Sequence, residues 1–342
     1  MRYNVKHPQI YLFFLLALVF FSCRQSKKPD VSQIKIDIHI ERFDKDLAQF
    51  KKQGALKADQ LLKKKYGSFY DDYIHRMIGT PDYTGAQILD TLYQDKAYAD
   101  LSKEADGVFP SLAQEEQSLS QVFKYIKYYY PNAHVPKFIA FISGFAVQMP
   151  IGDNYMGLGL DMFLGKDSQF YRAIVTSVPV YLSRRFSPEY ISPRIAETYA
   201  REELFPEREE NRSLISKMIY SGKILYFMDK VLDDQVSDEI KIGYTPEQLN
   251  WCKKYEGNIW AFFMENELLF STDYPKMQVF LSEGPFTPGI GEKNQSAPKL
   301  GIWTGWQIVR KYMEKNPEIT LQQLMEDNDA QKILSASKYK PK

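Results

Sequence analysis

The sequence predicts an α+β fold that is predominantly helical, arranged as one large domain with a small central sheet or hairpin. Apolar residues recur at the three- and four-residue spacing of helices along most of the chain. Near the centre this pattern stops at a continuous apolar run, residues 138–142, and at a turn, residues 151–154, between two further apolar segments. No repeat of fixed period is present, so an array of repeated units is not expected.

Two helical stretches are expected before the central strand. Ile40, Phe43, Leu47 and Phe50 lie at helical spacing, which places them on one face of a helix. A longer stripe ends at Pro131, which cannot continue a helix, and consists of Leu119, Val122, Phe123, Ile126, Tyr129 and Tyr130.

The centre of the chain predicts strands. Residues 138–142 form a buried strand, and residues 145–150 and 155–163 flank a Gly-Asp-Asn turn as a β-hairpin. Gly157 and Gly159 alternate with leucines, so one face of that strand lacks side chains and another backbone is expected close by. Two helices, residues 188–204 and 212–232, are expected to pack on this sheet.

The C-terminal third contains two capping boxes. Thr245 and Gln248 form the first, with Pro246 at the first helical position, and Thr320 and Gln323 open a short C-terminal helix. The stripe after the first box is Leu249, Cys252, Glu256, Ile259, Trp260, Phe263, Glu267 and Phe270. Its two acidic members are either paired inside the protein or placed at the edge of the apolar face.

The N-terminus predicts export and lipid attachment. Arg2 and Lys6 precede an apolar run from Tyr11 to Phe21, which is shorter than the ~20 residues that span a bilayer. The run ends at Cys23 in a sequence similar to a bacterial lipobox, so we expect a signal peptide at residues 1–22 and acylation of Cys23. An ordinary secretory signal with a chance cysteine is the alternative. Residues 23–33 then form a lipidated tether, and residues 34–342 form the globular domain.

Charge and cysteine content exclude some classes of protein. Lys and Arg number 44 against 43 Asp and Glu, so net charge offers no argument for nucleic-acid binding. Cys252 is the second of only two cysteines, so an acylated Cys23 leaves it without a partner. Stability is therefore expected from the core and not from disulfides.

No catalytic motif is apparent. The four histidines, His7, His39, His75 and His134, include no pair within a helical turn that would hold zinc. Gly-x-Ser-x-Gly and a phosphate-binding loop are both absent. The acidic segment 233–239 is able to hold a hard cation, but it lacks the ligand pattern of an EF-hand. We therefore expect no metal and no cofactor.

A series of motifs carries a family resemblance over nearly the whole mature chain. In order they are residues 40–44 (IERFD), 159–165 (GLDMFLG), 170–171 (FY), 218–223 (MIYSGK), 241–248 (KIGYTPEQ), Trp251, 268–273 (LLFSTD), 301–309 (GIWTGWQIV), 333–334 (IL) and 339–342 (YKPK). This series resembles the GldB family of gliding-motility lipoproteins of Bacteroidetes. The resemblance implies a membrane-attached component of surface gliding, a process tied to type IX secretion.

A weaker similarity suggests a zincin-like layout, in which one helix carries His-Glu-x-x-His and a later helix supplies a third zinc ligand. Residues 195–201 (IAETYAR) match the first helix, with Glu197 and Arg201 at the two His positions and Thr198 at the general-base Glu. Ser221 stands at the third ligand position. The similarity implies a degenerate metallopeptidase, in which Glu197 and Arg201, four residues apart, are able to form an ion pair. An ordinary solvated helix face is the alternative.

The sequence thus predicts a non-enzymatic envelope lipoprotein that binds protein partners of the gliding machinery and no nucleic acid. Arg24, in place of Asp, favours the outer membrane over the inner membrane, and the lack of an acidic run after Cys23 favours a domain that faces the periplasm. One alternative is a residual hydrolase that recruits metal through Glu197, Asp161 or Glu203. Another is a glycan-binding lipoprotein that stacks Tyr and Trp on sugars. For Trp303 and Trp306 a core role is favoured over a contact role, because Ile302, Trp306, Val309 and Tyr312 are spaced for a buried helix face.

Overall fold

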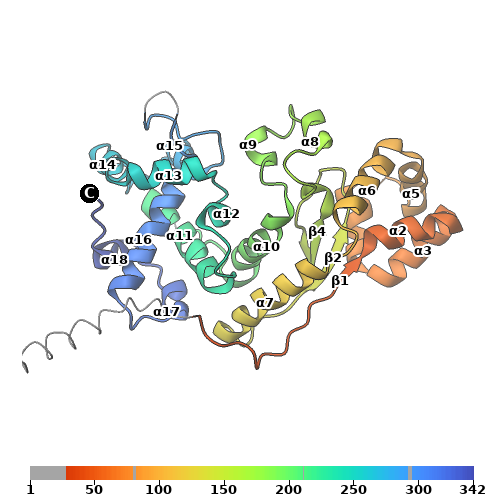
Figure 1. Cartoon of the computed structure of the whole chain (residues 1–342), viewed down its shortest axis with the longest axis horizontal. Coiled ribbons are helices and arrows are strands. Elements are labelled where there is room, and N and C mark those ends of the chain that lie inside the picture. Colours follow the sequence, from red (N-terminus) through yellow and green to blue (C-terminus); the bar gives the residue numbers. More distant parts are fainter. Residues whose placement is uncertain (1–27, 80–81, 211, 292–294) are drawn as a thin grey trace, which may run out of the picture. The chain divides into compact units, whose positions relative to one another are not determined.

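The computed structural model describes residues 28–79, 82–210, 212–291 and 295–342 (Figure 1). The fold is α+β and predominantly helical, as the sequence predicts. Contacts within the chain group residues Ile34–Lys342 into one unit, separate from the residues up to Gln33. The expected signal peptide and Cys23 lie outside the described residues. No helix in the described ranges combines the length and the apolar character needed to span a membrane.

A four-stranded mixed sheet lies among the helices. Its strands are β1 (Ile40–Arg42), β2 (Lys137–Phe141), β3 (Ile151–Gly152) and β4 (Tyr155–Gly159), in the order β1-β2-β4-β3. Both β1 and β4 run parallel to β2, whereas β3 is antiparallel to β4. The predicted central strand and hairpin are therefore present.

The hairpin differs from its prediction in extent. Ile151 and Gly152 form the short strand β3 and not part of the turn, which consists of Asp153 and Asn154, the latter at φ 64°. Residues 145–150 form no regular strand, although the carbonyls of Gln148 and Pro150 accept from Gly159 and Gly157. A Cβ at Gly159 would lie 2.6 Å from the carbonyl oxygen of Val147, so the predicted close backbone approach is confirmed there, whereas a Cβ at Gly157 would meet side-chain atoms of Pro150 and Phe141.

Helical spacing at Ile40 was misleading. Ile40 belongs to β1 and pairs with Phe138, and the helix α2 begins three residues later at Phe43. The three residues of β1 are extended because β2 offers them a parallel partner from a segment about 100 residues distant. Pairing of this kind overrides a local helical pattern.

The two faces of the sheet enter different clusters of apolar side chains. Phe138, Ala140 and Ile142 point toward the larger cluster, which includes the apolar stripe of α7 (Ala113–Tyr129). Ile139 and Phe141 point to the opposite face, where the rings of Phe43, Phe69 and Tyr73 pack. This alternation is the two-residue period of a strand, and it separates an N-terminal helical layer from the C-terminal helices.

The helices within and after the sheet segment of the chain have the following bounds. Between β1 and β2 are α2 (Phe43–Phe50), α3 (Ala55–Tyr66), α4 (Ser68–Asp72), α5 (Gly85–Gln94), α6 (Lys96–Val108) and α7. After it are α8 (Gln169–Ala173), α9 (Val180–Ser183), α10 (Ile191–Tyr199), α11 (Leu214–Val231), α12 (Asp238–Ile242), α13 (Pro246–Lys254), α14 (Glu256–Glu265), α15 (Tyr274–Leu281), α16 (Leu300–Lys315), α17 (Leu321–Glu326) and α18 (Ala330–Ser337). Short 3₁₀ turns lie at Lys51–Gln53, Leu160–Met162 and Pro188–Tyr190, and π-helical turns at Tyr73–Met77 and Ala200–Leu204.

The two helices predicted after the hairpin are confirmed. Pro188 opens a helical run that continues through α10 into the π-helical turn ending at Leu204, and α11 occupies most of the second range. Both capping boxes are formed as well, at Thr245 and Thr320.

The stripe after the first capping box is divided between two helices. Tyr255, at φ −110° and ψ 21°, separates α13 from α14. Of the two acidic residues in the stripe, Glu256 accepts a hydrogen bond from the Tyr339 hydroxyl, which is 2.8 Å away. Glu267 lies exposed beyond the end of α14 at φ 52°. One acidic residue is thus paired and the other lies at the edge.

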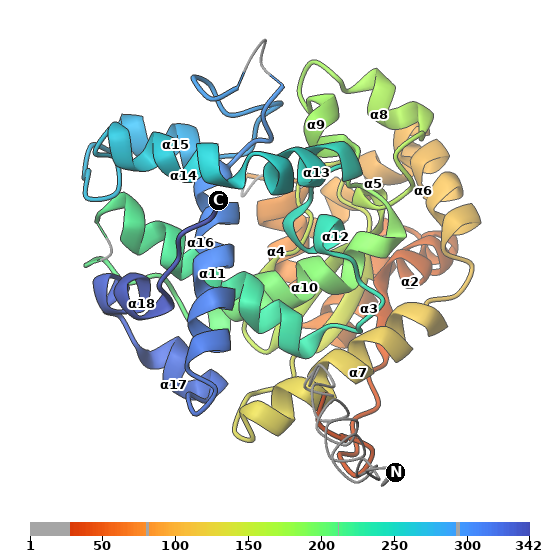
Figure 2. The same ribbon diagram turned by 60° about the vertical axis from the view of Figure 1, so that its left-hand side comes forward.

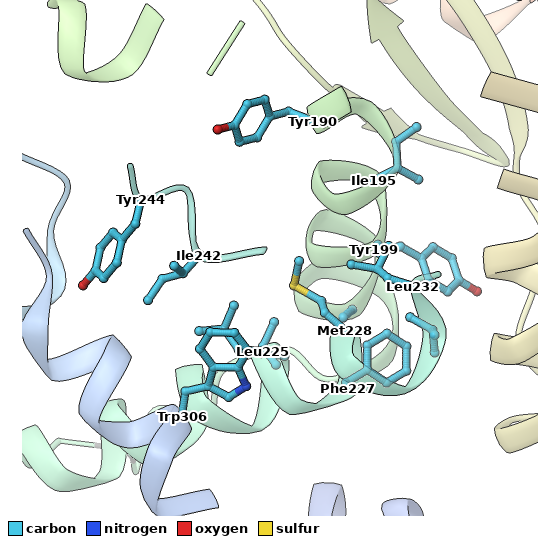
Figure 3. Close-up of a cluster of buried hydrophobic side chains, with 14 of the residues drawn as sticks. Tyr190, Ile195, Tyr199, Leu225, Phe227, Met228, Leu232, Ile242, Tyr244 and Trp306 are labelled. Atoms are coloured by element: carbon cyan, nitrogen blue, oxygen red, sulfur yellow. The ribbon is translucent and has the colours of Figure 1, made fainter. Parts of the chain in front are cut away.

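The C-terminal helices α11 and α16 form the centre of the larger core (Figure 2). Figure 3 shows Trp306 of α16 beside Leu225 of α11, with Met228 of α11 nearer to α10. Trp303 and Trp306 are fully buried, so the predicted core role is confirmed for both. Neither indole is available to stack on a sugar.

Candidate functional site

The candidate site begins on α10 and the π-helical turn that follows it. A single π turn inside a helix is uncommon and frequently lies at a functional site. Here it spans Ala200–Leu204 and includes Arg201, one of the residues that the metallopeptidase similarity singles out. Glu197 and Thr198 lie on the preceding turn of α10.

Glu197 is held by two guanidinium groups. Arg194 Nη1 lies 2.7 Å from Glu197 Oε2, and Arg201 Nε lies 3.1 Å from Oε1. The pair that the four-residue spacing allows is therefore formed, with Arg194 as an added partner. Burial alone would raise the pKa of Glu197, but Arg194 and Arg201 outweigh it and lower the pKa from 4.5 to about 2. The carboxylate is thus charged over the whole physiological range.

The other two residues of the metallopeptidase similarity have separate surroundings. Thr198 Oγ1 faces the sulfur of Met149 at 3.9 Å, in the segment before β3. Ser221 lies buried on α11, next to Tyr220, whose ring packs against the Arg201 guanidinium at 5.4 Å. The structure therefore brings Glu197 and Arg201 together, whereas among the described residues no polar contact joins Thr198 or Ser221 to them.

A second set of charged side chains lies on the segments that lead into α16. Lys299 precedes α16 in a left-handed conformation, at φ 43°, and its Nζ lies 2.5 Å from Glu283 Oε1. Arg185 Nη1 approaches the same oxygen at 2.9 Å. Burial lowers the pKa of Lys299, and Glu283 opposes this effect. Glu283 Oε2 is buried and has no hydrogen-bond partner among the described residues.

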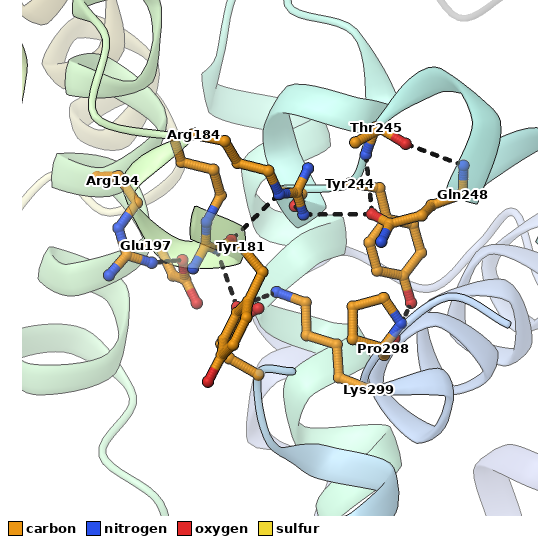
Figure 4. Close-up of polar contacts among 12 residues, drawn as sticks. Tyr181, Arg184, Arg194, Glu197, Tyr244, Thr245, Gln248, Pro298 and Lys299 are labelled. Carbon is orange, nitrogen blue, oxygen red and sulfur yellow. Dashed lines mark hydrogen bonds and ion pairs between the residues drawn. The ribbon is translucent and has the colours of Figure 1, made fainter. Parts of the chain in front are cut away.

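Arg184 is a cation with neutral partners. Its Nε donates to the carbonyl of Tyr181, and its Nη2 donates to the carbonyl of Gly243 at 2.7 Å and to Gln248 Oε1 at 3.2 Å. Burial, and next the neighbouring Arg185, lower the pKa of Arg184. Figure 4 shows the Arg194–Glu197 pair of α10, Lys299 before α16, and Arg184 after α9, with the Arg184 side chain directed toward Gln248.

We call these residues the basic cluster: Arg184, Arg185, Arg194, Glu197, Arg201, Glu283 and Lys299. Its two halves are electrostatically coupled, because Lys299 helps to lower the pKa of Glu197. Five cationic side chains stand against two carboxylates, which leaves an excess of three positive charges. Such an excess in a partly desolvated place is electrostatically costly unless an anion compensates it.

The carboxylates named for a residual hydrolase lie elsewhere or face solvent. Asp161 is fully buried and accepts hydrogen bonds from the backbone N–H groups of Ser143 and Phe145. Glu203 is exposed on the π turn. Throughout the described part of the chain, no group of three or more His, Cys, Asp or Glu side chains is placed to hold a metal ion.

In the acidic segment 233–239, Asp238 forms an ion pair with a cationic side chain of the same chain. Asp238 and Asp229 both receive the Arg310 guanidinium, at 2.7 and 2.8 Å, and Lys241 lies 2.9 Å from Asp229. Arg310 also packs over the Trp306 ring at 3.7 Å. This network ties α11, α12 and α16 together.

Sequence reasoning located Glu197 and Arg201 but missed Arg184, Arg185, Arg194, Glu283 and Lys299. A usable signal was present in the pair Arg184-Arg185, which sits between the apolar residues Leu182 and Phe186. Because arginines are mostly exposed in folded proteins, a pair of them within a largely apolar stretch is a candidate for a site. Lys299 and Glu283 offered no comparable signal, because each is a single charge in a loop.

Comparison with known proteins supplies the family. No curated protein and no solved structure is significantly similar to the chain, so the resemblance to a metallopeptidase layout stays a prediction. The family model described as gliding motility protein GldB matches residues 24–341, which is nearly the whole sequence. The chain therefore belongs to the GldB family of gliding-motility lipoproteins.

Proposed function

We propose that the protein is a non-enzymatic envelope lipoprotein that binds protein partners of the gliding machinery, in connection with type IX secretion. Acyl chains on Cys23 anchor it to the outer membrane, and the domain faces the periplasm. Membership of the GldB family over residues 24–341 is the observation that carries this proposal. Several acyl chains hold a protein stably at a membrane, whereas one chain binds only marginally.

The surroundings of Glu197 support the proposal that the protein is not an enzyme. A hydrolytic zinc site needs three ligands from the protein and an open position for water. At the positions that the metallopeptidase similarity assigns to ligands, both oxygens of Glu197 are engaged by Arg194 and Arg201. A guanidinium at a ligand position repels a divalent cation and cannot donate a lone pair to it.

Exposed apolar side chains support the binding of a protein partner. Phe270 and Tyr274, in and after the loop that joins α14 to α15, are 58% and 63% exposed, and Met264 is exposed beside them in sequence. The helices behind them are well packed, since the Phe263 and Phe280 rings meet at 5.2 Å. Large aromatic side chains presented on a firm base are typical of protein contact surfaces.

Complementation of a gliding bacterium that lacks its own family member tests the non-enzymatic role. The double variant Glu197→Gln/Arg201→Met removes the ion pair as a whole, which costs less stability than leaving one charge unpaired. We expect this variant to restore spreading as well as the wild type does, at equal abundance on immunoblots. Loss of spreading at normal abundance, together with peptidase activity of the purified wild type, would establish the residual-hydrolase alternative instead.

Site-specific photo-crosslinking in living cells tests the contact surface. We expect a benzoylphenylalanine at position 270 or 274 to capture a discrete envelope protein. Leu56 of α3 is 68% exposed and lies in the N-terminal layer, so the same probe at position 56 is the control. Equal capture from all three positions would count against a partner surface at α14 and α15.

Replacement of Cys23 tests the anchor. We expect Cys23→Ala to abolish metabolic labelling with a fatty-acid analogue and to release the protein from the membrane fraction. Labelling that persists in this variant would place the acyl chain elsewhere and contradict the assignment.

A further inference from the structure

The first residues of the globular domain lie along α7. Ile38 N–H donates to Ser120 Oγ at 2.8 Å, and Ile40 N–H donates to Glu116 Oε1 at 2.9 Å. Every second residue from 34 to 40 is partly or fully buried, and the residues between them are exposed. This alternation is that of an extended chain, so the segment runs straight beside the helix.

The direction of this segment shows where the domain begins. Ile36 lines the same cavity as Lys124, so residues 40, 38 and 36 lie beside residues 116, 120 and 124 of α7. Two residues of an extended chain rise by about 6.6 Å, and four residues of a helix rise by about 6 Å. The same step places Ile34 at the level of Tyr128, in the last turn of α7.

The length of the tether limits which side of the domain reaches the membrane. Residues 23–33 span at most ~40 Å even when fully extended. A globular domain with the length of residues Ile34–Lys342 has a diameter of about 50 Å. A tether anchored at Cys23 therefore keeps the C-terminal end of α7 near the membrane, and it is too short to pass around the domain to the far side.

The C-terminal end of α7 presents tyrosine and lysine side chains. Tyr128 is 48% exposed, and its ring meets the Tyr129 ring edge to face at 5.1 Å. Tyr129 in turn lies near Tyr226 of α11, and the Lys230 ammonium lies 4.8 Å from the centre of the Tyr226 ring. We call this surface the α7 end face, and it consists of Lys124, Lys127, Tyr128, Tyr129, Tyr226 and Lys230.

The α7 end face has a firm base. The last turn of α7 reaches α17 (Figure 1), where Gln322 Nε2 donates to the Tyr129 carbonyl at 2.6 Å. Lys127 Nζ donates to the carbonyl of Pro131 at 2.9 Å, which holds the following turn against the helix. Tyrosine combines an apolar ring with a polar hydroxyl, and lysine has an apolar stem with a charged tip. Both side chains are suited to the boundary between water and lipid.

Carboxylates also lie close to this face. Asp233 lines the same cavity as Lys124, and Glu326 lies near Tyr130. Net charge alone therefore does not bring the face to a membrane. The exposed Tyr128 ring supplies an apolar contact that the carboxylates do not oppose, and Lys127 adds attraction to anionic headgroups.

We propose that the α7 end face lies against the surface of a lipid leaflet that contains anionic headgroups. The Tyr128 ring enters the headgroup region, and Lys127 binds lipid phosphate groups. The inference rests on the proposed acylation of Cys23, and it deepens the proposed function by naming the surface that the domain turns to the lipid.

Fluorescence quenching of the full, lipid-anchored chain tests the docking face in vesicles of phosphatidylcholine with a minor share of phosphatidylglycerol. Cys252 is buried, so Asn132→Cys, in the exposed turn after α7, provides the reactive thiol for a fluorophore. We expect a lipid with a nitroxide on its headgroup to quench this fluorophore. The control is Leu56→Cys on α3, at the opposite face of the sheet, where we expect no loss of fluorescence. Equal quenching at both positions, or none at 132, would overturn the proposal.

Sedimentation of the same vesicles reports on the anchor separately. Protein that sediments with the vesicles but is not quenched at position 132 refutes the docking face and leaves the anchor at Cys23 intact. Protein that stays in the supernatant refutes the anchor and, with it, this inference.

Substitutions in the Asn132→Cys protein identify the side chains that make the contact. We expect Tyr128→Ser to lower the ratio of docked to undocked domain by about tenfold, which corresponds to ~50 Å² of apolar ring surface leaving water. Lys127→Gln should lower this ratio roughly fivefold at low salt and less at high salt, because salt screens the membrane charge. The exposed residues Tyr83 and Lys64 provide the matched controls Tyr83→Ser and Lys64→Gln, which should leave the ratio unchanged. Quenching that stays the same in Tyr128→Ser would contradict the contact.

Discussion

Gly222 of α11 and Gly305 of α16 meet where the two helices cross. A Cβ built on Gly305 would lie 1.9 Å from the carbonyl oxygen of Met218, and one on Gly222 would lie 2.4 Å from the Gly305 carbonyl carbon. Both helices are among the most buried of the described elements. The crossing therefore depends on two residues that lack side chains.

Gly305→Ala is expected to destabilise the protein by about 1–3 kcal/mol or more, because the added methyl group meets backbone that cannot yield. Urea unfolding measures the change. Gly107→Ala is the matched control: Gly107 lies in α6 with nothing within 4 Å of its built Cβ, so alanine should be neutral or stabilise by up to ~1 kcal/mol. Equal effects of the two substitutions would show that the helix crossing tolerates a side chain.

Glu197 is expected to make the protein sensitive to acid. The pKa of Glu197 is about 2 in the folded state against 4.5 for the free group, with burial opposing and Arg194 and Arg201 causing the decrease. A lowered carboxylate pKa stabilises the fold above pH 4.5, and this part is lost as the pH falls toward 2, to a total of up to ~3 kcal/mol. Unfolding free energies from pH 6 to pH 2 should converge between wild type and Glu197→Gln. Glu202→Gln, an exposed neighbour on the π turn, is the control and should follow the wild-type profile.

Lys223 is expected to make the stability of the protein rise with pH in alkali. This residue of α11 is buried and donates to the carbonyls of Met325 and Asp327, at 3.0 and 2.9 Å. Burial lowers the pKa of Lys223 from 10.5 to about 8. Between these values the unfolded chain binds more protons than the folded one, so stability rises with pH by up to ~3 kcal/mol. We expect denaturant unfolding at pH 8 and pH 10.5 to show this gain over Lys223→Met. A constant difference between the two proteins would contradict it.

The Asp161 carboxylate is expected to stabilise the conformation of the loop that precedes the hairpin. Phe145 N–H donates to Asp161 Oδ2 at 2.6 Å, and Phe145 itself has a left-handed backbone, at φ 68°. That conformation is uncommon for an aromatic residue and needs support from its surroundings. Asp161→Asn replaces an accepting oxygen with an NH₂ group and should cost ~1–3 kcal/mol. Thermal unfolding measures the cost, and Asp153→Asn in the exposed hairpin turn is the control.

Much of the fold follows from local pattern. The central strand, the helices after the hairpin and both capping boxes are readable because periodicity and cap residues act over a few positions. Gly159 likewise indicated a close backbone approach by its place in a strand. The break at Tyr255 was not predicted, and the strand at Ile40 could not be, since it depends on pairing with Phe138, which is distant in sequence.

The candidate site, like the fold, could be predicted from the sequence only in part. Glu197 and Arg201 are four residues apart on one helix, so their ion pair could be predicted from spacing. Their association with Arg185, Glu283 and Lys299 could not, because these residues come from separate loops that only packing brings together.

By itself, the sequence determined the helical α+β class, the local helix and strand signals, the near-neutral charge and the series of family motifs. Only the tertiary structure decided that cations from α9, α10 and the start of α16 lie together with an excess of positive charge. The physical reason is the distance along the sequence over which each effect acts. Backbone propensities and side-chain periodicity act over a few residues. The free-energy cost of placing like charges close together depends on their burial, and side chains become buried only when the helices pack.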